Sequence, residues 1–220
     1  MHWNYTVTMI LNFSIFIAGI IGIFKFTQIG DIYRPFIYLI WIGCITEILN
    51  TYFAYRYHNN VIVGVAYSLC ESLLLLWFFA KLGLFKTHKK LLYLLIGIFI
   101  IVWLADNFLS GNFGSSFSFY FDIVYAFSIV ILSVRTVNEL LFTEKEVLKN
   151  PTFLICIGLT IFFTYQVIQR MFNLYGLKDS SDFRRSVQRI LIVINCLTNL
   201  IFAFAVLWMR KRRPFTFRFE

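Results

Sequence analysis

The sequence has little charge for its length, because only 14% of its 220 residues are Asp, Glu, Lys or Arg. Soluble domains carry about 25% charged residues, whereas 60% of this chain is hydrophobic. The chain also has only 3 Pro, 11 Gly and 4 Cys, which excludes a collagen-like chain, a proline-rich disordered protein and a disulfide scaffold. The composition therefore predicts an integral membrane protein that lies almost entirely within the bilayer.

Histidine is equally scarce, and this removes several kinds of chemistry. The 3 His of the chain form no H-x-x-x-H pair, so the clustered ligands of a zinc hydrolase are missing. There is no G-x-S-x-G nucleophile elbow, no G-x-G-x-x-G turn and no P-loop. We therefore expect no metal, no cofactor and no catalytic residue that a motif identifies. Enzyme activity is the less favoured class.

Seven long apolar runs predict an all-α bundle of seven transmembrane helices, since a spanning helix needs about 17–25 mostly apolar residues. The runs are continuous rather than alternating, which favours helices over a β-barrel. The predicted spans are residues 5–24, 34–55, 61–82, 91–109, 118–141, 152–172 and 188–209. The loops between them are too short to fold alone, so we expect one transmembrane domain over residues 1–220 and no soluble domain.

The distribution of Lys and Arg between the loops predicts the orientation of the chain. With the N-terminus outside, the inner side holds 14 basic residues and the outer side 6, which together make the 20 of the sequence. We therefore predict a multi-pass protein of the plasma or bacterial inner membrane, with its N-terminus outside and its C-terminus in the cytoplasm. The net charge of +9 follows from this topology and indicates no nucleic-acid partner. The basic run at residues 210–213 is interpreted as a membrane anchor.

Two carboxyl groups, those of Glu47 and Glu71, lie deep inside predicted spans. At a rise of 1.5 Å per residue, Glu71 lies about 15 Å and Glu47 about 12 Å from the outer end of its span, both near the bilayer midplane. A charged group inside a membrane costs about 2.5–3.5 kcal/mol on insertion scales, so each is a candidate functional residue. Consecutive antiparallel helices could bring the two groups face to face, where they would share a proton.

Other polar side chains gather in the same outer half of the membrane. Gln166, Gln169 and Arg170 share one helical face, and Arg170 is the natural counter-charge for a carboxyl group. Polar groups on six of the seven helices predict a cavity that opens to the outside. The alternative is that the Asn and Gln side chains only join helices, at about 0.6 kcal/mol per hydrogen bond. The candidate ligand- or proton-binding residues are Glu47, Asn50, Tyr67, Glu71, Gln166, Gln169, Arg170, Asn195 and Asn199, with Asp106 and Asp122 as wetted helix caps at the outer rim.

The run from Thr46 to Phe79 carries Glu47, two Asn in the connecting loop and the Tyr-x-x-x-Glu pattern of Tyr67 and Glu71. With these features the run resembles a group of short seven-helix bacterial membrane proteins to which no activity has been assigned. The resemblance covers about a quarter of the chain. It implies a seven-helix fold and strengthens the glutamate pair, and it implies no function.

Four functions fit this pattern. The first is a ligand sensor that binds a small molecule or lipid and signals through a separate protein partner. The second is a small proton-coupled transporter, which discontinuous helices would favour, although no Gly or Pro interrupts a predicted span near its middle. The others are a non-catalytic subunit of a larger membrane complex and a carboxylate-dependent lipid hydrolase.

Overall fold

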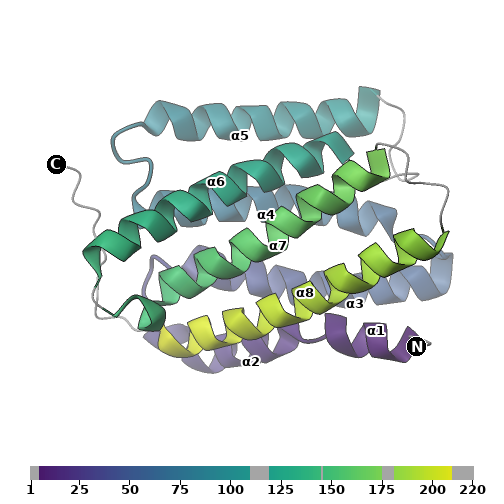
Figure 1. Ribbon diagram of the computed structural model, residues 1–220, viewed down its shortest axis with the longest axis horizontal. Coiled ribbons are helices and arrows are strands. Elements are labelled where there is room, and N and C mark those ends of the chain that lie inside the picture. Colours follow the sequence, from purple (N-terminus) through teal and green to yellow (C-terminus); the bar gives the residue numbers. More distant parts are fainter. Residues whose placement is uncertain (1–4, 110–118, 145, 175–180, 210–220) are drawn as a thin grey trace. The chain divides into compact units, whose positions relative to one another are not determined.

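The computed structural model describes residues 5–109, 119–144, 146–174 and 181–209, which form helices joined by short turns, with no strand among them (Figure 1). The α-helices are α1 (Tyr5–Asn12), α2 (Ile15–Lys25), α3 (Arg34–Tyr57), α4 (Val61–Leu82), α5 (Lys89–Leu104), α6 (Phe119–Thr143), α7 (Pro151–Leu174) and α8 (Ser181–Trp208). Short 3-10 turns follow α2 and precede α7, and one π-helical turn follows α5 at Ala105–Leu109.

Seven helical segments in the described part of the chain are long and apolar enough to cross a membrane. They coincide with the seven predicted spans to within a few residues, which confirms the all-helical fold class and indicates a multi-pass membrane protein. The basic run at residues 210–213 lies outside the described residues. The four cysteines are free, and Cys70 is exposed whereas Cys156 is buried.

The first of these segments differs from the expected continuous helix, because it is interrupted at Phe13 and Ser14 between α1 and α2. Tight turns carry the backbone through the break, with the Ser14 amide 3.2 Å from the Leu11 carbonyl oxygen. The Ser14 hydroxyl is buried and receives a hydrogen bond of 2.9 Å from the side-chain amide of Asn199. This partner lies in α8, so a pattern search for Gly and Pro in the first span could not reveal the interruption.

The chain divides into two compact units, and the single transmembrane domain that the sequence predicts stays a prediction. Unit 1 contains α1, α2, α7, α8 and α6 from Ala126 onward. In this unit α8 packs against α1, α2 and α7. The α7–α8 contact is close at Gly158, where an added Cβ would lie 2.7 Å from the Phe202 ring. A small residue at such a contact allows the two helices to approach closely, as is usual between membrane helices.

Unit 2 contains the helices of Phe26–Tyr125, namely α3, α4, α5 and the first turns of α6. Here α4 packs against both α3 and α5. Its core is aromatic, with Phe36 of α3 against Phe78 of α4 at 5.6 Å between ring centroids. Both rings are fully buried. The core of unit 2 therefore lies along α4, which also carries Glu71.

Candidate functional site

The centre of the candidate site is the carboxyl group of Glu71, on the face of α4 that is buried within unit 2. Both of its oxygens accept a hydrogen bond from a tyrosine hydroxyl. Tyr67, one turn earlier on α4, donates to Oε1 at 3.0 Å, and Tyr125 of α6 donates to Oε2 at 2.9 Å. Within the described part of the chain, no Lys or Arg forms an ion pair with Glu71. Two hydroxyl groups therefore satisfy both oxygens of this buried carboxyl group.

An aromatic cluster holds Tyr125 in position beside Glu71. Its ring stacks on Phe121, one turn earlier in α6, at 5.1 Å, and meets the edge of Phe99 of α5 at 6.5 Å. Phe99 and Phe121 are fully buried, and Tyr125 is 1% exposed. The cluster therefore shields this side of the carboxyl group from water.

The start of α6 is fixed by Asp106, which lies in the π-helical turn after α5. Its Oδ2 accepts a hydrogen bond of 3.0 Å from the backbone amide of Phe121, so the carboxylate satisfies one of the free amides at a helix N-terminus. π-helical turns are frequent at functional sites. Asp106 thus helps to set the position of the helix that carries Tyr125.

Asp122 is buried, with 4% of its surface exposed, and not wetted as the sequence suggested. It lies within electrostatic range of Glu71, so the second carboxyl group near Glu71 is that of Asp122. A residue in the first turn of a predicted span is expected at the membrane surface. The packing of this turn against the rest of unit 2 explains the burial instead.

Glu47 of α3 is only half-buried and has a different environment. No hydrogen bond joins its carboxyl group to that of Glu71 among the described residues, although Tyr67 lies within electrostatic range of both. One turn further along α3, the buried Oδ1 of Asn50 has no hydrogen-bond donor in the described part of the chain. Tyr67 therefore interacts with both glutamates and bonds to Glu71 alone, and a proton shared by the two carboxyl groups stays a prediction.

The remaining predicted residues, Gln166, Gln169, Arg170, Asn195 and Asn199, belong to unit 1 and not to the unit that holds the glutamates. Asn199 is buried and bonds to Ser14, which gives it a role in joining α8 to the interruption of the first segment. Gln166 is buried on α7, while Gln169, Arg170 and Asn195 are half-buried. Of the predicted polar set, the carboxyl groups with Asn50 and Tyr67 thus belong to unit 2, and these five residues belong to unit 1.

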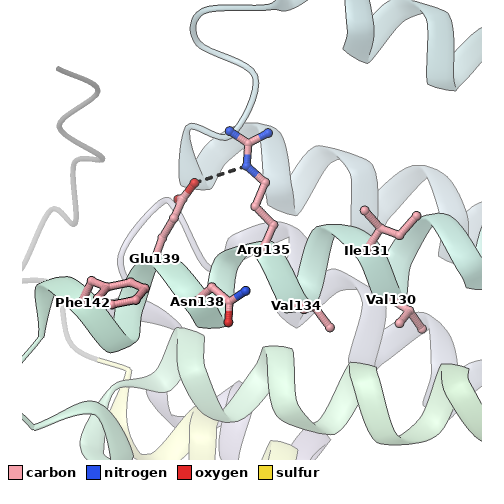
Figure 2. Close-up of a pocket in the computed structure, with 7 residues that line it drawn as sticks. All are labelled: Val130, Ile131, Val134, Arg135, Asn138, Glu139 and Phe142. Carbon is pink, nitrogen blue, oxygen red and sulfur yellow. Dashed lines mark hydrogen bonds and ion pairs between the residues drawn. The ribbon is translucent and has the colours of Figure 1, made fainter.

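A groove of about 550 Å³ runs along α6 in unit 1 (Figure 2). Its lining residues all come from this helix, and they are Val130, Ile131, Val134, Arg135, Asn138, Glu139 and Phe142. Arg135 and Glu139 form the expected i, i+4 ion pair at 3.2 Å, drawn as the dashed line in Figure 2. The groove is a shallow and mostly apolar surface, and its only charged side chains are already paired with each other.

The residues predicted from the sequence do not include Tyr125. The available signal was its i, i+3 spacing from Asp122, which places both near one face of α6. Trp103 was missed altogether, although its indole N–H donates to the Val65 carbonyl oxygen at 3.1 Å and so ties α5 to α4. In the described residues, no group of three or more His, Cys, Asp and Glu is arranged to hold a metal ion.

Comparisons with protein-family models, with curated protein sequences and with solved structures find no significant match for this chain.

Proposed function

We propose that this chain is a small proton-coupled transporter of the plasma or bacterial inner membrane, in which Glu71 takes up and releases the proton. The observation that supports this is the buried carboxyl group of Glu71. Its two oxygens accept hydrogen bonds from hydroxyl groups on two different helices. A side chain needed only for packing would be apolar, because a buried charge is costly to desolvate. Carboxyl groups at membrane depth are typical of proton pathways.

Protonation of Glu71 changes the hydrogen bonds that join α4 to α6. An ionised carboxylate only accepts hydrogen bonds, whereas a protonated one carries a donor on one oxygen. A tyrosine that meets this donor turns its hydroxyl and accepts instead of donating. At Tyr125 the proton would thus reverse the direction of the hydrogen bond that joins α4 to α6. Such a change is what a carrier needs to link proton binding to a second conformation.

The interruption of the first membrane segment favours transport over the ligand-sensor function that the sequence placed first. Transporters commonly build their substrate sites from discontinuous helices, because the break frees backbone and side-chain polar groups inside the membrane. Here neither Gly nor Pro stands at the break. A hydrogen bond between the buried side chains of Asn199 and Ser14 stabilises it instead. Unit 1 thus contains an interrupted helix of the kind that transporters use, and unit 2 contains the buried carboxyl group of Glu71.

The test uses the full chain in proteoliposomes with an imposed pH gradient. Uptake of labelled amino acids, sugars and organic acids is measured with the gradient and after a protonophore has removed it. We expect at least one solute to accumulate only with the gradient. Glu71→Gln should abolish this accumulation yet retain exchange of the same solute across the membrane, because exchange requires no net proton movement.

Glu47→Gln serves as the matched control, since it makes the same chemical change on the neighbouring helix. Gradient-driven accumulation in Glu71→Gln at the wild-type rate would contradict the proposal. Proton binding can be followed separately by the infrared carbonyl band of a protonated carboxyl group. If the band is lost in Glu71→Gln but the wild type transports no solute, the proposed transport function is wrong. The chain would then be a proton-responsive sensor.

A further inference from the structure

The turn between α4 and α5, which lies at one end of unit 2 in Figure 1, is held rigidly by its backbone. Gly83 adopts a left-handed conformation with φ of 98°. The Leu84 amide bonds to the Phe79 carbonyl and the Gly83 amide to the Ala80 carbonyl, at 3.3 and 3.1 Å, which is the pattern of a Schellman motif. Leu84 and Phe85 are each 4% exposed, so they fasten the turn to the core.

The residues that follow this fixed turn are basic, and they line a groove of about 720 Å³. Its lining consists of Lys86, Thr87, His88, Lys89, Lys90, Leu91 and Leu94, among which there is no acidic residue. Three lysines are therefore held near one another on a rigid turn. None of the three forms an ion pair with a described residue.

Three other basic side chains are neutralised locally by acidic partners, unlike the lysines of the turn. Arg34 pairs with Asp31 at 2.8 Å, Arg135 with Glu139 at 3.2 Å, and Lys149 with Glu146 at 3.1 Å. The groove also contains the start of α5, where His88 makes no side-chain cap and no acidic residue stands in the first turn. A helix N-terminus without a cap adds a partial positive charge to that of the lysines.

The groove continues from these charges onto apolar side chains. Leu91 and Leu94, one turn apart on α5, are 41% and 58% exposed, and Tyr93 beside them is 70% exposed. The turn joins two helices that are long and apolar enough to cross the membrane, so it lies at the level of the lipid head groups if they do. An exposed tyrosine near a helix end is typical of this interface.

We propose that this groove binds the phosphate head group of an anionic phospholipid, with an acyl chain along Leu91 and Leu94. The lysines and the N-terminus of α5 recognise the phosphate, and the leucines distinguish a lipid from a soluble anion. The bound lipid belongs to the leaflet on the side where the sequence analysis places most of the basic residues. This site is independent of the transport function proposed above.

The experiment measures lipid binding to the full chain by native mass spectrometry from detergent micelles. The probes are phosphatidylglycerol, which is anionic, and phosphatidylcholine, which has no net charge. Each lysine near an anionic lipid surface contributes about 1 kcal/mol, which corresponds to about a fivefold change in affinity. We expect one phosphatidylglycerol to bind per chain, and the Lys86→Gln/Lys89→Gln/Lys90→Gln variant to bind it about a hundredfold more weakly.

The matched control is Arg34→Gln/Arg135→Gln/Lys149→Gln, which removes the same charge from side chains that already have acidic partners. The proposal requires this control to bind phosphatidylglycerol as the wild type does. The single variant Lys90→Gln, expected to be about fivefold weaker, provides a second test if the triple variant is unstable. Equal losses in both triple variants would show unspecific attraction and overturn the proposal. So would displacement of the lipid by millimolar inorganic phosphate, which would identify a soluble anion as the ligand.

Discussion

The regions around Glu71 and Glu47 have similar predicted depths and lie on neighbouring helices, yet the two carboxyl groups have different surroundings. Glu71 is buried, and its carboxyl group accepts hydrogen bonds from two tyrosine hydroxyls. Glu47 is half-buried, and it is its backbone carbonyl that accepts a hydrogen bond, of 2.9 Å, from the Thr51 hydroxyl. The difference shows that depth alone does not determine the surroundings of a carboxyl group. A donor on a second helix matters as well, because it allows a carboxyl group to remain buried.

The largest expected effect on stability comes from Tyr125→Phe, which removes one hydroxyl and keeps the ring. The Oε2 oxygen of Glu71 would lose its donor in a place that water does not reach, and an unsatisfied buried group costs about 1–3 kcal/mol. The free energy of unfolding in mixed micelles of a mild and a denaturing detergent measures this loss.

Phe121→Leu is a useful companion variant, because it perturbs the same aromatic cluster without touching a hydrogen bond of Glu71. In the double variant Tyr125→Phe/Glu71→Leu the penalty of Tyr125→Phe should largely disappear, since the unsatisfied oxygen is gone. An undiminished penalty in that background would assign the effect to packing and would remove Glu71 from the explanation.

Tyr67→Phe should have a smaller effect, about 1 kcal/mol, because the Tyr67 side chain is half-buried and water can replace part of the lost bond. Tyr67 also lies within electrostatic range of both glutamates. The same unfolding measurement, repeated with Glu47→Gln, sharpens the comparison. Additive effects of Tyr67→Phe and Glu47→Gln would show that Tyr67 serves Glu71 alone, while non-additive effects would link the two regions.

The helices could be predicted from the sequence, and the interruption of the first one could not. Apolar runs of sufficient length determine where membrane helices lie, since backbone groups must be satisfied within each segment. The break at Phe13 and Ser14 depends on a tertiary hydrogen bond from Asn199, which is 185 residues away in the sequence. No local pattern contains that information.

The candidate site could likewise be predicted in part. Counting residues along a helix gives the depth of Glu71, and the cost of a buried carboxyl group makes it a candidate. The rotation of each helix about its axis is decided by side-chain packing, and this rotation places Tyr125 and Asp122 near Glu71 and keeps Glu47 from bonding to it. For the same reason the sequence could not foresee that Asp122 is buried.

Ser14→Ala tests whether loss of the Ser14–Asn199 hydrogen bond in unit 1 destabilises the protein as much as loss of a hydrogen bond to Glu71 in unit 2. Hydrogen bonds between neutral side chains of membrane helices contribute about 0.6 kcal/mol on average. We expect a loss of this size in the free energy of unfolding, with Ser14→Thr retaining most of the stability because its hydroxyl can still accept the Asn199 amide. A loss as large as that of Tyr125→Phe would mean that the interruption, and not the carboxyl group, is the more strained feature.

The smallest effect is expected for Arg135→Gln, which removes the donor from a third carboxyl group, that of Glu139. Here 48% of the arginine side chain and 27% of the glutamate side chain are exposed. Exposed i, i+4 ion pairs contribute about 0.3–0.5 kcal/mol, because water and salt compete for both charges. Arg135→Gln and Tyr125→Phe each remove one hydrogen bond to a glutamate, so the ratio of their effects isolates burial as the cause. Equal losses in the two variants would show that burial does not distinguish Glu71 from the partly exposed Glu139.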